Sequence, residues 1–130
     1  MDCPVCSQAM ITLEMTGVEV DYCVQCRGLW LDAGELELLI NDKAAATRLI
    51  ASFRRTTGQS EQARPCPICD RKMEKVLVGP DHPALLIDRC IKGHGLWFDE
   101  GELRDILDRA ELDEHSRIKR YLAEMFGHDT

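Results

Sequence analysis

The 130-residue sequence has no apolar run long enough to cross a membrane and no stretch with the pattern of a secretory signal peptide. Its most apolar segments, residues 36–40 and 84–87, are far shorter than the roughly 18 apolar residues that a spanning helix needs. Basic residues are not in excess either, because 23 Asp and Glu outnumber 16 Lys and Arg and give a formal net charge of −7. These absences argue against a membrane protein and against broad binding to nucleic-acid backbones, which relies on Lys and Arg. We expect a cytoplasmic protein, in a compartment that keeps thiols reduced.

Cysteine, in contrast, is abundant. The sequence has seven cysteines, an odd number that does not suit a framework of paired disulfides. In a reducing compartment, pairs with Cys-x-x-Cys spacing favour metal binding, and redox chemistry is the second interpretation. Six of the seven form such pairs: Cys3 and Cys6, Cys23 and Cys26, and Cys66 and Cys69.

The chain contains two copies of one pattern. Each copy opens with a Cys-Pro-x-Cys motif and continues to a run of Gly-Leu-Trp-x-Asp-x-Gly-Glu-Leu. The motifs are 63 residues apart and the runs 67, so the second copy has four more residues between motif and run. The extra residues fall around 79–83, a segment rich in turn residues, and we interpret them as a longer hairpin loop. The motifs begin at Cys3 and Cys66, and the runs span residues 28–36 and 95–103.

Each copy is predicted to form a zinc ribbon, in which a β-hairpin joins two cysteine knuckles. Residues enriched in β-branched and apolar types flank the turn residues Thr16 and Gly17 in the first copy and the inserted loop in the second. The predicted strands are residues 10–15, 18–22, 72–78 and 84–89.

A capping signal follows each ribbon. Asp32 precedes Glu35 by three residues, and Asp99 precedes Glu102 in the same way. This spacing is a variant of the capping box, in which the first side chain caps the helix and the glutamate returns to it. Both pairs therefore predict the start of a helix.

Long amphipathic helices are predicted behind these signals. Apolar residues at helical spacing predict a first helix over residues 33–55 and a second with its stripe from Leu103 to Met125. Leu112 lies off the second stripe, which allows a bend near 111–116. The polar segment TTGQSEQA, residues 56–63, is the predicted linker. The expected fold is thus a small α+β protein of two tandem zinc ribbons, each followed by a long amphipathic α-helix, divided into residues 1–55, 56–63 and 64–130.

The first copy has the spacing Cys-x2-Cys-x16-Cys-x2-Cys, which is typical of zinc sites. Structural zinc takes four tetrahedral ligands and accepts thiolates readily. Disulfides or a thioredoxin-like redox motif fit poorly, because two pairs bracket a short hairpin without a βαβ context. Iron in a rubredoxin-like site uses the same four thiolates and stays an alternative here. The predicted ligands are Cys3, Cys6, Cys23 and Cys26.

The second copy keeps three cysteines but has Gly93 opposite Cys26. His94 is the nearest replacement, because an imidazole reaches further than a thiol and the flanking glycines free the backbone. His82 is a weaker competitor, since it lies in the inserted turn. Three thiolates and one histidine are a standard closed, structural zinc set, so we expect two zinc ions per chain. The predicted ligands of the second site are Cys66, Cys69, Cys90 and His94.

The Cys-Pro-x-Cys, Cys-x-x-Cys and Gly-x-Trp-x-Asp-x-Gly-Glu-Leu elements together resemble the bacterial zinc-ribbon domains grouped as "transcription factor zinc-finger", named for their likeness to the ribbon of general transcription factor IIB. The resemblance covers residues 1–40 and 64–107 as two tandem copies, with His94 in place of the last cysteine of the second. It implies zinc binding and a ribbon fold, and it implies transcription only by analogy.

Two sets of residues invite a functional interpretation. Trp30 and Trp97 suit a stacking platform for a base or a peptide, but their identical placement before both predicted helices favours core residues that cover the metal sites. The Asp–Glu pairs are explained by capping. With the cysteines and His94 assigned to metal, no serine–histidine or cysteine–histidine arrangement remains, and we predict that the protein is not an enzyme.

Charge is distributed unevenly along the chain. Residues 64–98 carry a net charge of +2, whereas residues 99–130 carry −5. The second ribbon is therefore the surface on which nucleic acid is most plausible, although a solvated hairpin face explains the same charges. The candidate contacts are Arg64, Arg71, Lys72, Lys75, Arg89 and Lys92.

The apolar stripes of the predicted helices are longer than the small ribbons can cover, so they pack on each other within one chain or between two chains of a homodimer. We predict a non-catalytic zinc-ribbon scaffold that binds a protein partner. The alternative is a nucleic-acid-binding regulator that uses the second ribbon, and a zinc reservoir or redox sensor is a third reading.

Overall fold

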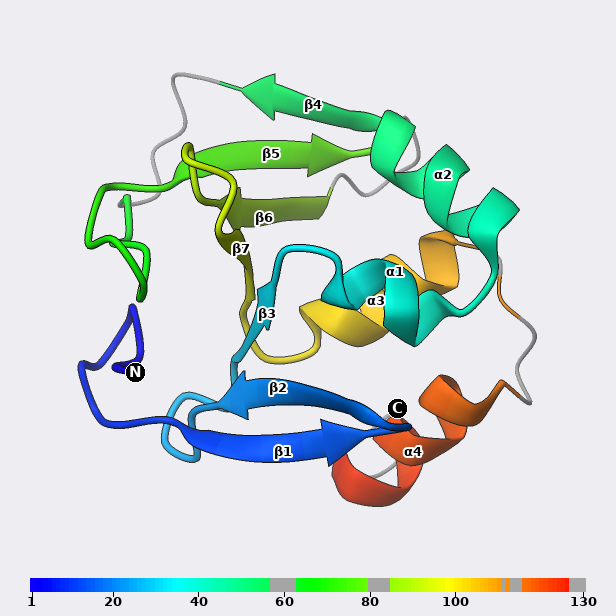
Figure 1. Ribbon diagram of the computed structural model, residues 1–130, viewed down its shortest axis with the longest axis horizontal. Coiled ribbons are helices and arrows are strands. Elements are labelled where there is room, and N and C mark those ends of the chain that lie inside the picture. The colour runs from blue at the N-terminus through cyan, green and yellow to red at the C-terminus, as the bar shows by residue number, and fades with distance from the viewer. Residues whose placement is uncertain (57–62, 80–84, 111, 113–115, 127–130) are drawn as a thin grey trace.

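The computed structural model describes residues 1–56, 63–79, 85–110, 112 and 116–126, and within these residues it is a small α+β protein (Figure 1). Seven strands form one antiparallel sheet in the order β1-β2-β3-β7-β6-β5-β4. The strands are β1 (Ile11–Met15), β2 (Val18–Tyr22), β3 (Leu29–Asp32), β4 (Phe53–Thr56), β5 (Glu74–Val78), β6 (Leu85–Arg89) and β7 (Gly95–Phe98). No helix in this described part is long and apolar enough to cross a membrane.

The sheet is built from two equivalent three-stranded units that meet at its centre. β1, β2 and β3 belong to the first copy of the sequence pattern, and β5, β6 and β7 to the second. β3 pairs with β7 so that Trp30 lies directly opposite Trp97, its own equivalent in the repeat. The pseudo-two-fold axis of the molecule therefore passes between the two tryptophans, and the two ribbons share one sheet.

In the described residues, four shorter helices replace the two long helices that the apolar periodicity predicts. They are α1 (Glu35–Ile40), α2 (Lys43–Ala51), α3 (Glu102–Arg109) and α4 (Arg117–Phe126). The prediction of one helix over residues 33–55 is wrong at two places. Asn41 takes a left-handed conformation with φ of 52° that ends α1, and the side chain of Asp42 accepts a hydrogen bond of 3.0 Å from the N–H of Ala45 to begin α2.

The chain after α2 forms a strand. Residues 53–56 pair antiparallel with β5 as β4, which the helical interpretation of this segment missed. In the second half, α3 ends at Arg109 and α4 begins at Arg117, so the predicted bend near 111–116 separates two helices. Residues 111 and 113–115 lie outside the described part. Of the predicted linker, residues 57–62 also lie outside it.

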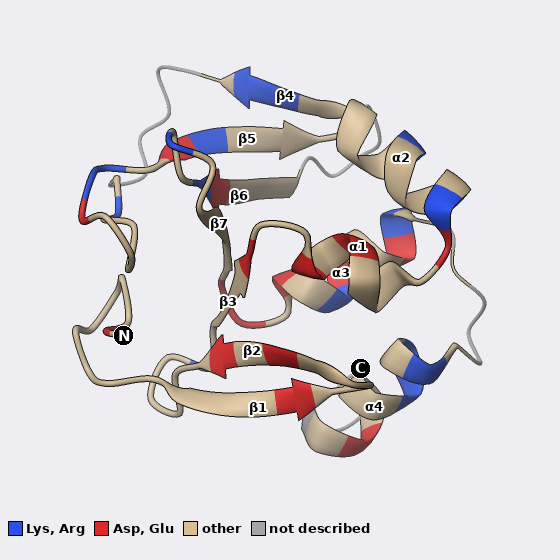
Figure 2. Cartoon of the chain, in the orientation of Figure 1, with Lys and Arg blue, Asp and Glu red and all other residues tan. Residues whose placement is uncertain are grey.

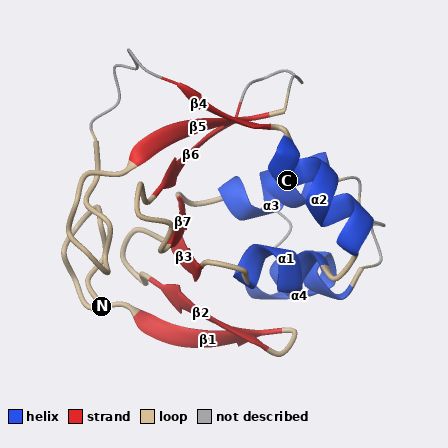
Figure 3. Cartoon of the chain, turned by 45° about the horizontal axis from the view of Figure 1, so that its top comes forward, coloured by secondary structure: helices blue, strands red, loops and turns tan. Residues whose placement is uncertain are grey.

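The helices gather on one side of the curved sheet, and the cysteine-bearing loops lie on the opposite side (Figure 3). The helix side holds the larger apolar core, to which both ribbons and all four helices contribute. The apolar stripes of the helices are buried within the chain in this core, as Leu36, Leu39, Leu49, Leu103, Ile106, Leu107, Ile118 and Leu122 show. Intramolecular packing thus covers the faces that suggested a homodimer.

Candidate metal centres

The four cysteines of the first copy converge between two tight turns. One turn closes with the N–H of Ser7 on the carbonyl of Cys3 (2.9 Å), and the other with the N–H of Arg27 on the carbonyl of Cys23 (2.7 Å). Ser7 and Arg27 both take positive φ, which redirects the chain after the second cysteine of each pair. The Sγ atoms of Cys6 and Cys23 are 3.6 Å apart, and all four Sγ atoms lie within 4.8 Å of one another. Bonds of about 2.3 Å from a tetrahedral zinc put sulfurs about 3.8 Å apart, so the site has the dimensions that zinc requires.

Backbone donors prepare the sulfurs of the first site for metal. The N–H of Val5 points at Sγ of Cys3 and the N–H of Cys26 at Sγ of Cys23, each at 3.3 Å. Burial raises the pKa of the Cys23 thiol, but the N–H of Cys26 and the other donors outweigh it and lower the pKa to about 7. Burial, followed by the hydrogen bond to Cys6, raises the pKa of Cys26 to about 12. One thiol is therefore ready to ionise near neutral pH, and zinc displaces the remaining protons as it binds.

The second site combines three thiols with His94. The Sγ atoms of Cys69 and Cys90 are 3.7 Å apart, and Nδ1 of His94 is 3.4 Å from Sγ of Cys90. The turn after Cys90 closes one residue earlier than in the first copy, with the N–H of Gly93 on the carbonyl of Cys90 (3.0 Å) and a φ of 83° at Gly93. The shorter turn moves the fourth ligand to the position that Arg27 occupies in the first copy. The ligand atoms of Cys66, Cys69, Cys90 and His94 all lie within 4.8 Å of one another.

The thiols of the second site are prepared in the same way. Burial opposes ionisation of Cys90, but the backbone N–H groups of His94 and Lys92 lower its pKa to about 6; the N–H of Lys92 lies 3.3 Å from the sulfur. Burial raises the pKa of Cys66 to about 11. The carbonyl of His94 accepts the N–H of Ala33 at 2.9 Å, which anchors this ligand to the first ribbon. The histidine is thus held in place by the central β3–β7 pairing as well as by its own turn.

Trp30 and Trp97 pack between the two metal centres. Both are fully buried in a second apolar cluster that contains cysteines of both sites and Met73. Each indole N–H donates to an aspartate two residues on, Asp32 at 2.8 Å and Asp99 at 3.0 Å. A buried ring has no face left for stacking on a base or a peptide, so the structure favours the core interpretation of both tryptophans.

Gly28 and Gly95 permit this packing, a role that the sequence pattern did not reveal. A Cβ atom at Gly28 would collide with the ring of Trp97, and one at Gly95 would collide with the ring of Trp30 and the carbonyl of Leu31. Each tryptophan therefore rests on the glycine of the other copy, next to that copy's last ligand turn. The repeated Gly-Leu-Trp run was the available signal for this contact.

Only one of the two hydrogen bonds of each predicted capping box is formed, the one from the backbone to the glutamate. The side chain of Glu35 accepts the N–H of Asp32 at 2.7 Å, and Glu102 accepts the N–H of Asp99 at 2.9 Å, as predicted. The aspartate side chains do not cap the helices, because they bind the indole N–H groups instead, and the residues at both helix starts are glycines with positive φ. These carboxylates have structural partners.

The six basic residues singled out in the second ribbon divide into two groups. Lys75 is buried, and its Nζ lies 2.6 Å from Oδ1 of Asp88, so the two side chains form a buried ion pair. Burial raises the pKa of Asp88 more than Lys75 lowers it. Arg64 pairs with Asp99, and Nε of Arg89 is 2.8 Å from Glu74. The other three, Arg71, Lys72 and Lys92, are exposed on the two knuckles of the second site (Figure 2).

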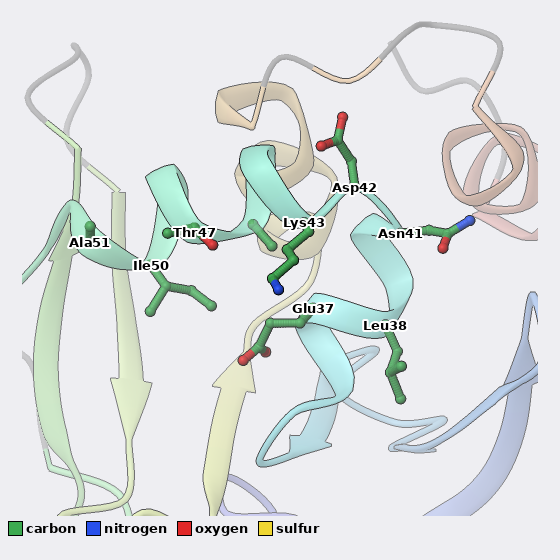
Figure 4. Close-up of a pocket in the computed structure, with 9 residues that line it drawn as sticks. Glu37, Leu38, Asn41, Asp42, Lys43, Thr47, Ile50 and Ala51 are labelled. Carbon is green, nitrogen blue, oxygen red and sulfur yellow. The ribbon is translucent and has the colours of Figure 1, made fainter.

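One groove lies away from the metal ligands, between α1 and α2 (Figure 4). It has a volume of about 750 Å³, and Leu38 and Ile50 contribute apolar surface while Glu37, Asp42 and Lys43 contribute charge. None of its lining residues is a predicted ligand. His82, the weaker competitor for the second metal, lies outside the described residues.

Comparison with known families supports the metal assignment. The sequence model of the family described as "Transcription factor zinc-finger" matches residues 2–42, which include all four ligands of the first site. Its match covers about a third of the chain and does not extend to the second copy. No curated protein and no solved structure matches the chain. The family match and the two ligand sets together indicate that the protein binds two zinc ions, each held by four protein side chains.

Proposed function

We propose that the protein is a non-catalytic zinc-ribbon scaffold that binds another protein. The closed coordination of both metal centres carries this proposal. Four protein ligands fill each tetrahedral set, which leaves no position for a water molecule or a substrate. Closed sites of this kind stabilise small folds, because metal binding supplies folding free energy directly.

The carboxylates beside the helix starts also have structural partners. The aspartates bind the tryptophan N–H groups, and the glutamates bind the backbone where each helix starts. A general base or nucleophile must be free to reach a substrate. A scaffold role requires no such group and agrees with this arrangement.

The test is affinity capture with the zinc-loaded protein from a nuclease-treated lysate, with the captured proteins identified by mass spectrometry. The matched control is the chelator-treated protein. We expect at least one protein to be retained by the zinc-loaded form and lost with the control. Capture of nucleic acid alone, in the absence of nuclease, would contradict the proposal.

A second candidate is nucleic-acid binding by the knuckles of the second site. Arg71, Lys72 and Lys92 are exposed there, and none of them is in an ion pair within the described residues. A phosphate-binding surface would lose affinity steeply with salt, because the logarithm of the binding constant falls with the logarithm of the salt concentration by a slope close to the number of phosphate contacts. Replacing these three residues by alanine should remove any salt-dependent binding of a labelled duplex, and unchanged binding would exclude the knuckles.

A further inference from the structure

The two outer edges of the sheet differ in a way that points to a binding site. β5, in the second ribbon, is the equivalent of β1 in the first, and each pairs with the following strand in the same register. β4 covers the outer edge of β5. Nothing in the described part of the chain pairs with the outer edge of β1, which lies at the end of the sheet (Figure 1).

An uncovered edge strand presents unpaired backbone N–H and C=O groups that another extended segment can pair with. β1 is five residues long, and Ile11 on it is 46% exposed. The chain itself supplies the precedent for the occupant. The strand that covers β5 has the sequence Phe-Arg-Arg-Thr, so this type of edge already accepts a basic segment.

Charge on the β1–β2 hairpin matches such a segment. Glu14 on β1 lies directly opposite Glu19 on β2, and like charges facing each other destabilise a sheet. The equivalent pair in the second ribbon is Leu77 opposite Leu86. The first hairpin thus carries a repulsion that the second avoids and that a cation beside Glu14 would relieve.

The register of β4 places a cation at that position. Arg54 lies opposite Leu77, the equivalent of Glu14. A strand bound to β1 in the same register would therefore bring an arginine against Glu14. Arg117 and Arg120 of α4 line a shallow groove with Glu14, but neither forms an ion pair with it within the described residues.

A second carboxylate on the same face has no basic side chain opposite it. Asp21 lies opposite Thr12, whereas its equivalent Asp88 lies opposite Lys75 and is paired with it. The same backbone position is therefore neutralised by the chain in the second ribbon and left acidic in the first.

We propose that β1 is a docking edge for an extended basic segment of a partner protein, which adds to the sheet antiparallel to β1 as β4 adds to β5. This rests on the proposed scaffold function and names the chemistry of the partner. Backbone pairing along β1 supplies affinity, and arginine or lysine side chains facing Glu14, Glu19 and Asp21 supply specificity.

The test uses the zinc-loaded full-length protein and the peptide Ala-Ser-Phe-Arg-Arg-Thr, the sequence of residues 51–56, in an NMR titration at about 50 mM salt. We expect amide shifts concentrated on β1 and its turn. The same peptide with both arginines replaced by glutamates should not bind. Absence of binding by the arginine peptide, or shifts away from β1, would overturn the inference.

Two variants with equal charge make the test specific. Thr12→Lys recreates on the first hairpin the lysine–aspartate pair of the second. It should therefore lower the affinity of the protein for the arginine peptide about tenfold. Thr47→Lys adds the same charge on the exposed surface of α2 and should change the affinity less than about twofold. Equal weakening by both variants would mean general attraction to an acidic protein and would overturn the inference.

A second copy of this chain is the other occupant that the outer edge of β1 could bind. If light scattering shows a dimer or larger species that the arginine peptide dissociates, the edge pairs with β4 of a second copy, and the partner assignment is wrong. A captured partner that binds the wild type and Thr12→Lys equally would leave the scaffold function standing and place its surface elsewhere.

Discussion

The two ribbons of this protein share a backbone and differ in what surrounds it. Their hairpins have the same strand lengths and registers, and the same tryptophan precedes the first helix of each copy, which begins with the same glutamate hydrogen-bonded to the backbone. The first ribbon has four cysteine ligands, an outer strand that no described residue covers, and carboxylates with no basic side chain opposite them in the sheet register. The second has a histidine ligand, a covering strand and a buried ion pair. The metal sites and the tryptophan core therefore hold the common fold, and the copies have diverged in the fourth ligand, in the covering of the outer strand and in the charges of the hairpin.

The change of ligand illustrates how a small backbone adjustment keeps a metal site. Gly93 closes its turn one residue early, and the imidazole of His94 then reaches the place of a thiol. A left-handed residue is needed in both turns, but the first copy places Arg27 there after the ligand and the second places Gly93 before it. The second metal site thus keeps four ligands although its fourth ligand is shifted by one residue in the sequence.

Removal of one ligand from each ribbon should have the largest effect. Structural zinc contributes about 10–16 kcal/mol in small domains, more than most such domains have as net stability. We expect Cys26→Ala and His94→Ala each to bind one zinc instead of two and to lose the amide protection of the affected ribbon. Metal analysis and hydrogen exchange measure the two effects. Two zincs in His94→Ala would show that the fourth ligand of the second site lies elsewhere, whereas His94→Cys should retain both.

The buried ion pair of the second ribbon should give the next largest difference. Lys75→Met leaves Asp88 buried without its cation, and breaking a buried pair costs about 3–5 kcal/mol. At the equivalent exposed position, Thr12→Met should change the free energy of unfolding by less than about 0.5 kcal/mol. Denaturant unfolding of the zinc-loaded proteins measures both. Lys75→Met with Asp88→Leu should recover most of the loss; a double variant as unstable as the single one would contradict this account.

The reciprocal glycine contacts should respond more moderately and nearly symmetrically. A methyl group at Gly28 or Gly95 must displace a fully buried tryptophan, and overpacking of this kind costs about 1–3 kcal/mol. Gly95→Ala should be the more harmful, because its Cβ would come closer to the carbonyl of Leu31 than a Cβ at Gly28 would come to the carbonyl of Phe98. Thermal unfolding of the two variants, compared with Gly17→Ala in an exposed turn, tests the order. Gly17 has a φ of 87° and nothing near its Cβ position, so Gly17→Ala tests backbone strain without a tryptophan contact. If Gly17→Ala lowers the stability and the variants at Gly28 and Gly95 do not, the tryptophan contacts do not limit these positions.

The metal ligands and the hairpins were predictable because their determinants are local. A Cys-x-x-Cys pair sits on one turn, and alternation with a central turn defines each hairpin within a dozen residues. The ribbon centre was not predictable in this way. The pairing of β3 with β7 places Trp30 opposite Trp97, 67 positions later in the sequence. The repetition of the Gly-Leu-Trp run was the sequence feature that hinted at this pairing.

The long helices failed for a related reason. Apolar periodicity continues through residues 33–55, but Asn41 ends α1 and Asp42 begins α2. The spacing of apolar residues alone does not show such helix boundaries. The segment after α2 has apolar and basic residues that suit either a helix or a strand, and its pairing with β5 decides for the strand. Tertiary contacts overrode local preference at this point.

The smallest expected effect concerns Asp21 of the first ribbon, which has no basic side chain opposite it. Burial, followed by the charge of Asp32, raises the pKa of Asp21, so its ionised form is disfavoured in the folded state. Asp21→Asn should therefore stabilise the protein near pH 7.5 by a few tenths of a kcal/mol, the usual size for a partly exposed charge. This gain should shrink as the pH falls through the raised pKa of the folded state, and it should vanish only well below about 4, where the wild-type side chain is protonated in both the folded and unfolded states. Unfolding of both zinc-loaded proteins between about pH 7.5 and 5 measures the difference, and a gain that grows as the pH falls would assign it to something other than the charge.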